Sequence, residues 1–368
     1  MTDFFKIIND FKISAEERLD AAAKIAKNFK QDLDAVCEVD LHCHSFYSDG
    51  YFSPTAKVFE AFRRKMKAIA IADHDVFDGQ IEALRAGEIF GIDVIAAAEF
   101  YTNRPGIEII AHFPDKDDFI RRFKTGIFDS VVKPIKKAKK KQLEGMIARI
   151  PDCFAKFAFN AEIKEEDIDR YVRNGISTKG DISVIMWQKY GQELRKRGIA
   201  DDVKDFQARY TTNLQMLDLP LEIELDLSPD AFVKRILNWG GLPGLSHPTE
   251  LRRKEGLNNQ ALIEVIEKLG NIGLQTIEVD GWRNGICPES GRNQTEVFNE
   301  MRLNYNSRHP ERLPLLFTNG SDDHNQPGEG LELGCGKSRN LKAEFGKYEN
   351  ISLLKQRQKF ILSNMKGE

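Results

Sequence analysis

AIAIADHD occupies residues 68–75, and this stretch indicates the fold because a short apolar strand ends there in three ionisable side chains. The same plan recurs in VDLHCH at residues 39–44, DVIAAAEF at 93–100, LPGLSHP at 242–248 and LPLLFTNGSDDH at 313–324. Segments of helical pattern separate these strands; one begins at Ser53-Pro54, where a capping serine precedes a proline in the first turn. Strands that alternate with helices of this length favour a parallel sheet with right-handed crossovers, so we predict an α/β fold.

The polar residues gather where the predicted strands end. His42 and His44 are two residues apart, so a strand places both on one face, as a chelating pair requires. In a β/α barrel the carboxyl ends of the strands surround the active site, so side chains from different strands can converge. The other candidates are Asp49, His74, Glu99, His112, His247, Asp322 and His324. Imidazoles with carboxylates suit zinc, manganese or iron, and this many together predict a metal site.

Three parts of the chain lie outside this pattern. Residues 1–38 read as a helical extension, and residues 346–368 as a terminal helix. Residues 39–113 and 228–345 carry the barrel pattern. Residues 114–227 are charged and mostly helical in pattern, so we predict a helical insertion on one barrel loop, which caps the barrel mouth.

Composition sets the broad class. The 368 residues carry a formal net charge of −3, which favours neither a nucleic-acid nor a membrane partner. No apolar run approaches the roughly 20 residues of a membrane span. The five cysteines are scattered without a CxxC pair, which fits a reducing cytoplasm better than a disulfide framework.

Read together, DLHCHSFYSDG, IADHD, AAAEF, GLSHP and NGSDDH resemble the motifs of the polymerase and histidinol phosphatase (PHP) family. The resemblance implies a distorted seven-stranded β/α barrel with two or three divalent cations, commonly manganese, zinc or iron. It also implies hydrolysis of phosphoesters, and the helical insertion is similar to that of stand-alone members that act on nucleotides or short RNA ends.

The resemblance implies three groups of ligands. The first cation would be held by His42, His44, Glu99 and Asp322, and the second by Glu99, His247 and one ligand from the strand IEIIAHF at residues 107–113. Glu108 and His112 lie on the same face of that strand, and either could be this ligand. The third cation would be held by Asp49, His74 and His324.

The expected reaction is hydrolysis of a phosphomonoester by a hydroxide that bridges two cations, with Glu99, Asp322 and His324 as the catalytic residues. The relatives tend to have Gly-Arg after His-Pro, whereas here Arg252 and Arg253 come a few residues later. These arginines, with Trp282 and Arg283 after the strand IEVD, are the candidates for substrate binding. We expect a small phosphorylated substrate, with short single-stranded RNA as a variant, and neither a membrane nor a stable protein partner.

Two other functions fit parts of the pattern. A metal-dependent C–N hydrolase of the amidohydrolase kind also begins with His-x-His on a β/α barrel, but that class generally needs a lysine at a strand end, and no lysine occupies such a position here. A non-catalytic metal-binding module is the other alternative, but loss of function should erase ligands, and nearly the whole set is present.

Overall fold

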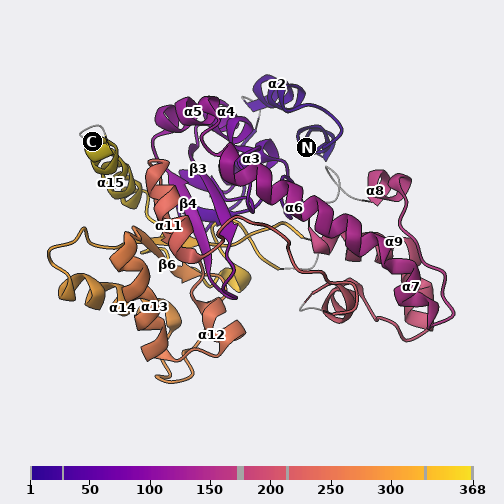
Figure 1. Cartoon of the computed structure of the whole chain (residues 1–368). Helices are drawn as coiled ribbons and strands as arrows, with labels where there is room; N and C mark the ends of the chain where they lie inside the picture. The colour runs from indigo at the N-terminus through magenta and orange to yellow at the C-terminus, as the bar shows by residue number, and fades with distance from the viewer. Residues whose placement is uncertain (1, 27–28, 172–177, 213–214, 327–329, 366–368) are drawn as a thin grey trace. The chain divides into compact units, whose positions relative to one another are not determined.

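The computed structural model describes residues 2–26, 29–171, 178–212, 215–326 and 330–365 (Figure 1). The chain forms two compact units. The first consists of Met1–Ser45, Gly50–Phe128 and Asp226–Glu368, and the second of Phe46–Asp49 and Asp129–Leu225.

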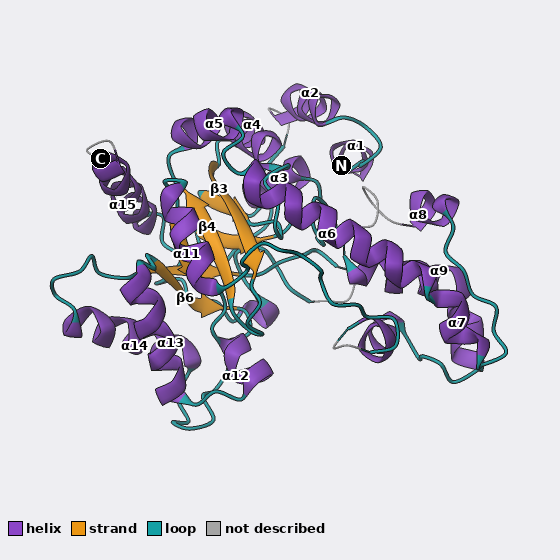
Figure 2. Ribbon diagram, viewed as in Figure 1, coloured by secondary structure: helices purple, strands orange, loops and turns teal. Residues whose placement is uncertain are grey.

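The first unit is built on one seven-stranded sheet in the order β1-β2-β3-β4-β5-β6-β7 (Figure 2). The strands are β1 Val39–Cys43, β2 Ala68–Ile71, β3 Asp93–Tyr101, β4 Glu108–Phe113, β5 Leu242–Leu245, β6 Thr276–Gly281 and β7 Leu316–Gly320. The sheet curls until its first and last strands meet, which confirms the predicted distorted barrel.

One strand differs from the prediction of a parallel sheet. β4 runs antiparallel to both β3 and β5, while the other neighbouring strands are parallel. The reason is the short turn at residues 102–107, because parallel neighbours need a crossover of a dozen or more residues. The first residue of β4, and not its last, therefore lies level with the end of β3, where Tyr101 pairs with Glu108.

Hydrogen bonds close the barrel between β1 and the end of β7. The Asn319 side chain donates to the Val39 carbonyl oxygen at 2.7 Å, and the Asp322 amide donates to that of His42 at 2.7 Å. The buried Asp40 carboxylate accepts from the Ser321 amide at 3.0 Å. Gly320 permits this approach, since a Cβ atom there would lie 2.3 Å from His42 Cβ.

Helices of the first unit follow the strands, and several begin or end at capping residues that can be recognised in the sequence. Ser53 caps α3 by accepting from the Ala56 amide, and Gly91 ends α4 in the left-handed region. Ile351 and Leu354 of α15 share a buried cluster with Val39 and Ala68, the first residues of β1 and β2. The helices are α1 Thr2–Ile8, α2 Ala15–Ile25, α3 Pro54–Arg63, α4 Gln80–Phe90, α5 Lys116–Thr125, α11 Pro229–Asn238, α12 Thr249–Glu255, α13 Asn259–Ile272, α14 Gln294–Arg308, the short 3-10 helix η3 Lys337–Arg339 and α15 Glu349–Met365.

Over its described residues the second unit consists of helices and connecting loops, and it has a core of its own. Its elements are α6 Asp129–Ala148, α7 Ile150–Ala155, α8 Glu165–Tyr171, α9 Lys179–Lys196, α10 Val203–Phe206 and the π-helix η2 Gln207–Thr211. Phe154, Ile185, Met186 and Phe206 are fully buried in one apolar cluster. The role of this unit as a cap stays a prediction. Across both units, none of the described helices combines the length and apolar character that a membrane span requires.

Gly320→Ala tests the closure of the barrel. The added methyl group meets the backbone-proximal part of His42, so we expect the free energy of unfolding to fall by about 1–3 kcal/mol, as in other overpacked cores. Urea denaturation measures this loss. Gly285→Ala is the matched control, since a Cβ atom there meets nothing within 4 Å; equal stability of the two variants would contradict the tight β1–β7 approach.

Candidate metal centre

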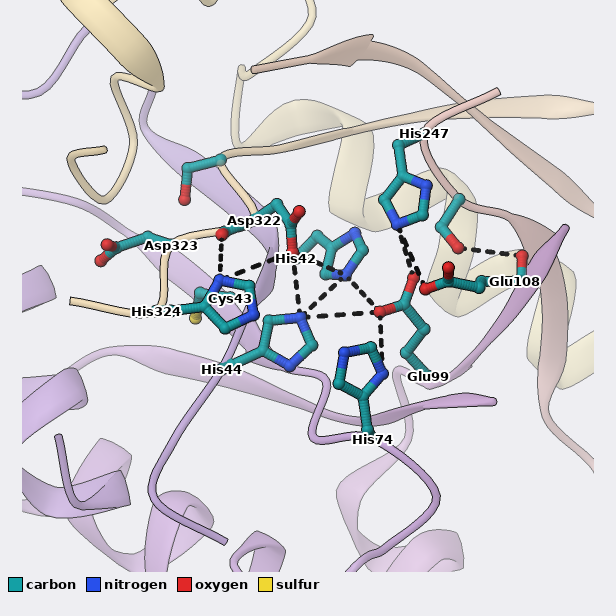
Figure 3. A network of polar contacts seen from close by, with 12 residues as sticks. His42, Cys43, His44, His74, Glu99, Glu108, His247, Asp322, Asp323 and His324 are labelled. Carbon is teal, nitrogen blue, oxygen red and sulfur yellow. Dashed lines mark hydrogen bonds and ion pairs between the residues drawn. The ribbon is translucent and has the colours of Figure 1, made fainter. Parts of the chain in front are cut away.

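Glu99, near the end of β3, is the centre of a buried polar cluster (Figure 3). Its carboxylate is fully buried, and imidazole nitrogens approach both of its oxygens. Oε2 lies 3.1 Å from His42 Nε2 and 3.4 Å from His74 Nδ1, and Oε1 lies 3.0 Å from His247 Nε2. Strand ends far apart in the sequence therefore meet at one carboxylate.

The first predicted ligand group is brought together on one side of Glu99. His42 Nε2 and His44 Nε2 are 3.2 Å apart, and Asp322 Oδ1 is 3.1 Å from His44 Nε2 and 3.6 Å from His42 Nε2. Behind His42, the Nδ1 atom lies 2.7 Å from Oε2 of Glu278 on β6. This carboxylate accepts a hydrogen bond from the Nδ1–H group, so the Nε2 lone pair points towards the cluster.

The second group distinguishes the two candidates on β4. Glu108 Oε2 lies 3.6 Å from His247 Nε2, so Glu108 joins the cluster. His112 instead donates from Nε2 to the Leu41 carbonyl oxygen at 2.9 Å, deeper in the barrel. The geometry favours Glu108, because the antiparallel β4 carries its first residue, and not its last, to the mouth, and the choice between Glu108 and His112 stays a prediction.

Two residues of the third predicted group, His74 and His324, lie near His44 of the first group. A nitrogen of each of His44, His74 and His324 lies within 4.8 Å of the others. His324 Nδ1 is 2.7 Å from the Asp322 carbonyl oxygen, to which it donates, so Nε2 is the nitrogen that would serve as the predicted ligand atom. Asp49 lies in the segment Phe46–Asp49, which belongs to the second unit, and its role as a ligand stays a prediction.

Backbone conformation at the site is unusual. Asp322 has φ 53°, His247 has φ 23° and Asp75 has φ 61°, all in the left-handed region that non-glycine residues rarely adopt. Such conformations persist where the surrounding structure holds them, and they concentrate at functional sites. The strain therefore coincides with two of the predicted ligands.

The cluster fits divalent cations on two grounds. Among the described residues, neither oxygen of Glu99 accepts a hydrogen bond of good geometry, although both are buried. Five of the six distances among the ligand atoms of the first group lie between 3.1 and 3.6 Å, which matches the ~3.3 Å between neighbouring ligands around a tetrahedral ion with bonds of ~2.0–2.1 Å. A shared cation explains this spacing better than direct hydrogen bonds do.

Opposite charges hold the cluster together in the absence of cations. Burial alone would lower the pKa of His42. The Glu99 and Glu278 carboxylates outweigh this effect and raise the pKa to well above its ordinary value. Burial likewise opposes the protonation of His247, yet Glu99 and Glu108 raise its pKa to about 9. Burial raises the pKa of Glu99, and the imidazoles of His42 and His247 lower it to well below its usual range.

The four predicted substrate-binding residues line one open cavity of about 510 Å³. Trp282 donates from Nε1 to Asp322 Oδ2 at 2.8 Å, so it links this cavity to the first ligand group. Arg283 stacks on Trp282 with its guanidinium carbon 4.0 Å from the ring centroid. Arg252 and Arg253 are paired with the carboxylates of Glu289 and Glu250 at 2.7 and 2.6 Å.

Sequence reasoning missed three residues around the cluster. Glu278 lies within its strand and not at the strand end, and Tyr101 carries no charge that would mark it. The Tyr101 hydroxyl lies 2.9 Å from His74 Nε2, which leaves Nδ1 to face Glu99. Lys254 Nζ lies 3.3 Å from Glu108 Oε1 and could have been noticed only by its closeness to Arg252 and Arg253 in the sequence.

Comparison with known proteins gives a family match. The family model of the PHP domain matches residues 40–219. A 5'-3' exoribonuclease from Haemophilus influenzae is 43% identical over 67 residues, which are 18% of this chain and 24% of that protein. An error-prone DNA polymerase from Nocardia farcinica is 40% identical over 70 residues, 18% of this chain and 6% of that protein. The chain thus matches about a quarter or less of the length of these relatives.

Two solved structures share the fold. A predicted metal-dependent phosphoesterase from Bifidobacterium adolescentis has a TM-score of 0.61 at 22% identity, over 86% of this chain and 94% of that one. An amidohydrolase from Chromobacterium violaceum, with bound sulfate and no metal, has a TM-score of 0.61 at 19% identity, over 86% and 96%. At these identities the similarity establishes the barrel fold alone.

The two candidates on β4 can be separated by metal content. We expect Glu108→Gln to lose about one metal equivalent per chain, because it removes the charge of a ligand beside His247. We expect His112→Asn to keep the full content, since His112 bonds to the Leu41 carbonyl oxygen. Elemental analysis of manganese-loaded protein gives both values; loss of metal from His112→Asn alone would reverse the assignment.

Metal binding should release protons at pH 7. The pKa of His247 is about 9 and that of His42 lies well above its ordinary value, so both are protonated at pH 7 without metal. Ligand imidazoles must be neutral, so at least one proton should leave per chain, and fewer as the pH rises through 9. Titration calorimetry in buffers of different ionisation enthalpy measures this number, and heats independent of the buffer would contradict it.

Proposed function

This chain carries a PHP domain, and from that premise we propose that it is a metal-dependent phosphoesterase that hydrolyses phosphomonoesters. Its substrates are nucleotides or related phosphorylated metabolites, with short RNA ends as a variant. The observation that carries the proposal is Glu99, whose two buried oxygens face imidazole nitrogens on opposite sides at 3.0 and 3.1 Å. A carboxylate in this position can join two cations.

We propose that the cluster holds two or three divalent cations, of manganese, zinc or iron. His42, His44, Glu99 and Asp322 would hold the first, and Glu99, Glu108 and His247 the second. His74 and His324, with Asp49, would hold the third. When bound, such cations supply a nucleophilic hydroxide near neutral pH and neutralise charge on the phosphate oxygens.

The chain's own residues orient this chemistry. Glu278 fixes the ring of His42 through Nδ1, and the Trp282 indole fixes the carboxylate of Asp322. Both contacts hold a ligand side chain in one direction, which preserves the geometry on which in-line attack depends. The ligands themselves, Glu99, Asp322 and His324 among them, would act in catalysis by holding charge in place, and no side-chain general acid is assigned.

The cavity lined by Arg252, Arg253, Trp282 and Arg283 is our candidate for the rest of the substrate. Trp282, which donates to Asp322, gives it an aromatic face, and Arg283, stacked on Trp282, gives it positive charge. A small phosphorylated molecule with a ring fits this chemistry. We propose no membrane and no stable protein partner.

A metal-dependent C–N hydrolase is the alternative, and the fold shared with an amidohydrolase favours it. That class generally needs a lysine at a strand end, whereas Lys254, 3.3 Å from Glu108, lies on helix α12 and the buried Lys57 is paired with Asp323, with Nζ 2.9 Å from Oδ2. A non-catalytic metal-binding module is the other alternative. A screen of the manganese-loaded protein separates the three, using nucleotides, bisphosphates, sugar phosphates, short RNAs and a panel of amides. Turnover of amides alone, or of no substrate, would overturn the proposal.

Glu99→Gln should abolish most of the phosphoesterase activity, by about 100-fold or more, and should lower metal content. The substitution removes the charge that two cations would share, and removal of key charge stabilisation typically costs 10²–10³ in rate. Steady-state assays with a phosphomonoester under matched manganese measure the loss, and circular dichroism checks the fold. Near-wild-type turnover would mean that Glu99 does not join two cations.

A further inference from the structure

The three consecutive cations of α12, Arg252, Arg253 and Lys254, have different surroundings. Arg252 is nearly buried and is held by Glu289, at 2.7 Å, and by the Leu257 carbonyl oxygen. These contacts tie α12 to neighbouring loops, so Arg252 has a structural role.

Arg253 is also paired with a carboxylate, but it lies at the surface. Its guanidinium makes a two-point contact with Glu250, at 2.9 Å from Nε to Oε1 and 2.6 Å from Nη2 to Oε2. The Arg253 side chain is 59% exposed, whereas that of Glu250 is 3% exposed. Glu250 therefore belongs to the wall of the cavity, and Arg253 covers it from outside.

Lys254 is the cation of this group that reaches the ligand cluster. Its Nζ lies 3.5 Å from Glu250 Oε2 and 3.3 Å from Glu108 Oε1. The other oxygen of Glu108 is 3.6 Å from His247 Nε2, which is 3.0 Å from Glu99 Oε1. A continuous series of contacts thus leads from the Lys254 ammonium through Glu108 and His247 to Glu99.

The charges around Glu250 do not balance. One buried carboxylate is shared by Arg253, Lys254 and Arg283, whose Nε is 3.2 Å from Glu250 Oε1. With Glu108, which Lys254 also contacts, three cations face two carboxylates, which leaves one positive charge that an anion could neutralise. The Lys254 side chain is 34% exposed, so an anion from solvent can reach it.

We propose that Lys254 is a catalytic residue that binds a phosphate oxygen of the substrate beside the second metal position. This inference rests on the proposed phosphoesterase function and adds a substrate contact that Arg252 and Arg253 do not provide. The Lys254 ammonium would donate to the phosphate while Glu108 serves as a ligand, and Glu250, 3.5 Å from Nζ, would orient the ammonium. The ammonium thereby adds fixed positive charge where the transition state gains negative charge.

The test compares Lys254→Met and Lys254→Arg with a control, Lys268→Met, in the full-length manganese-loaded protein. Lys268 is also a helical lysine paired with one carboxylate, 3.0 Å from Asp230 Oδ1, but it lies on α13 and contacts no proposed ligand. Three quantities are measured for each variant: manganese per chain, the affinity for inorganic phosphate by calorimetry, and kcat and KM for the best phosphomonoester.

For Lys254→Met we expect unchanged manganese content, and phosphate affinity and kcat/KM lower by about 10- to 100-fold, the loss typical of one charge-assisted hydrogen bond. Lys254→Arg should recover most of the affinity, and Lys268→Met should match the wild type. Phosphate affinity of Lys254→Met within twofold of the wild type would overturn the inference. Loss of manganese from Lys254→Met would overturn it too, since Lys254 would then only support Glu108.

The failures of the two proposals are distinguishable. A wild-type protein that turns over phosphoesters beside an equally active Lys254→Met variant refutes the lysine contact and leaves the phosphoesterase function standing. A wild-type protein that neither hydrolyses phosphoesters nor binds phosphate refutes both.

Discussion

Burial of the Glu99 carboxylate is the constraint on which the site depends. An ionised carboxylate away from water costs several kcal/mol unless positive groups surround it. Here those groups are imidazoles from β1, from the end of β2 and from the end of β5. Only a closed barrel brings these strand ends to one point, so fold and cluster stabilise each other.

The supporting layer around the ligands follows the same constraint. Asp40 ties β1 to the residues after β7, and the buried Lys57 donates to both the carbonyl oxygen and the carboxylate of Asp323. The Asp323 carbonyl oxygen also accepts the His44 amide at 3.0 Å. Contacts far from any substrate therefore fix where His44 and Asp322 lie, which explains why the barrel seam and the ligand set form one structure.

The sequence predicts the barrel and most of the cluster because two local signals agree. Apolar strands of four to nine residues end in histidines or carboxylates, and barrel geometry brings such ends together. The direction of β4 depends on turn length and not on hydrophobic pattern, so the sequence alone leaves both Glu108 and His112 as candidates. Glu278 and Tyr101 contact His42 and His74, which are predicted ligands. The sequence pattern of one strand does not reveal which residue of another part of the chain will contact it. The pairing of Arg252 with Glu289 likewise depends on tertiary contacts.

The length of the turn before β4 determines which β4 residue faces the His/Asp/Glu cluster. Thr102 donates from its hydroxyl to the Ile107 carbonyl oxygen at 2.7 Å, and Gly106 adopts φ 77°, so this short loop sets the register of β4. A slip of one residue would turn Glu108 to the opposite face, and a slip of two would bring Ile110 to its place. An insertion or deletion in this loop could thus remove or replace the proposed ligand Glu108 without any substitution in the His/Asp/Glu cluster. Divergence of such barrels can therefore proceed through loop length as well as through changes of ligand residues.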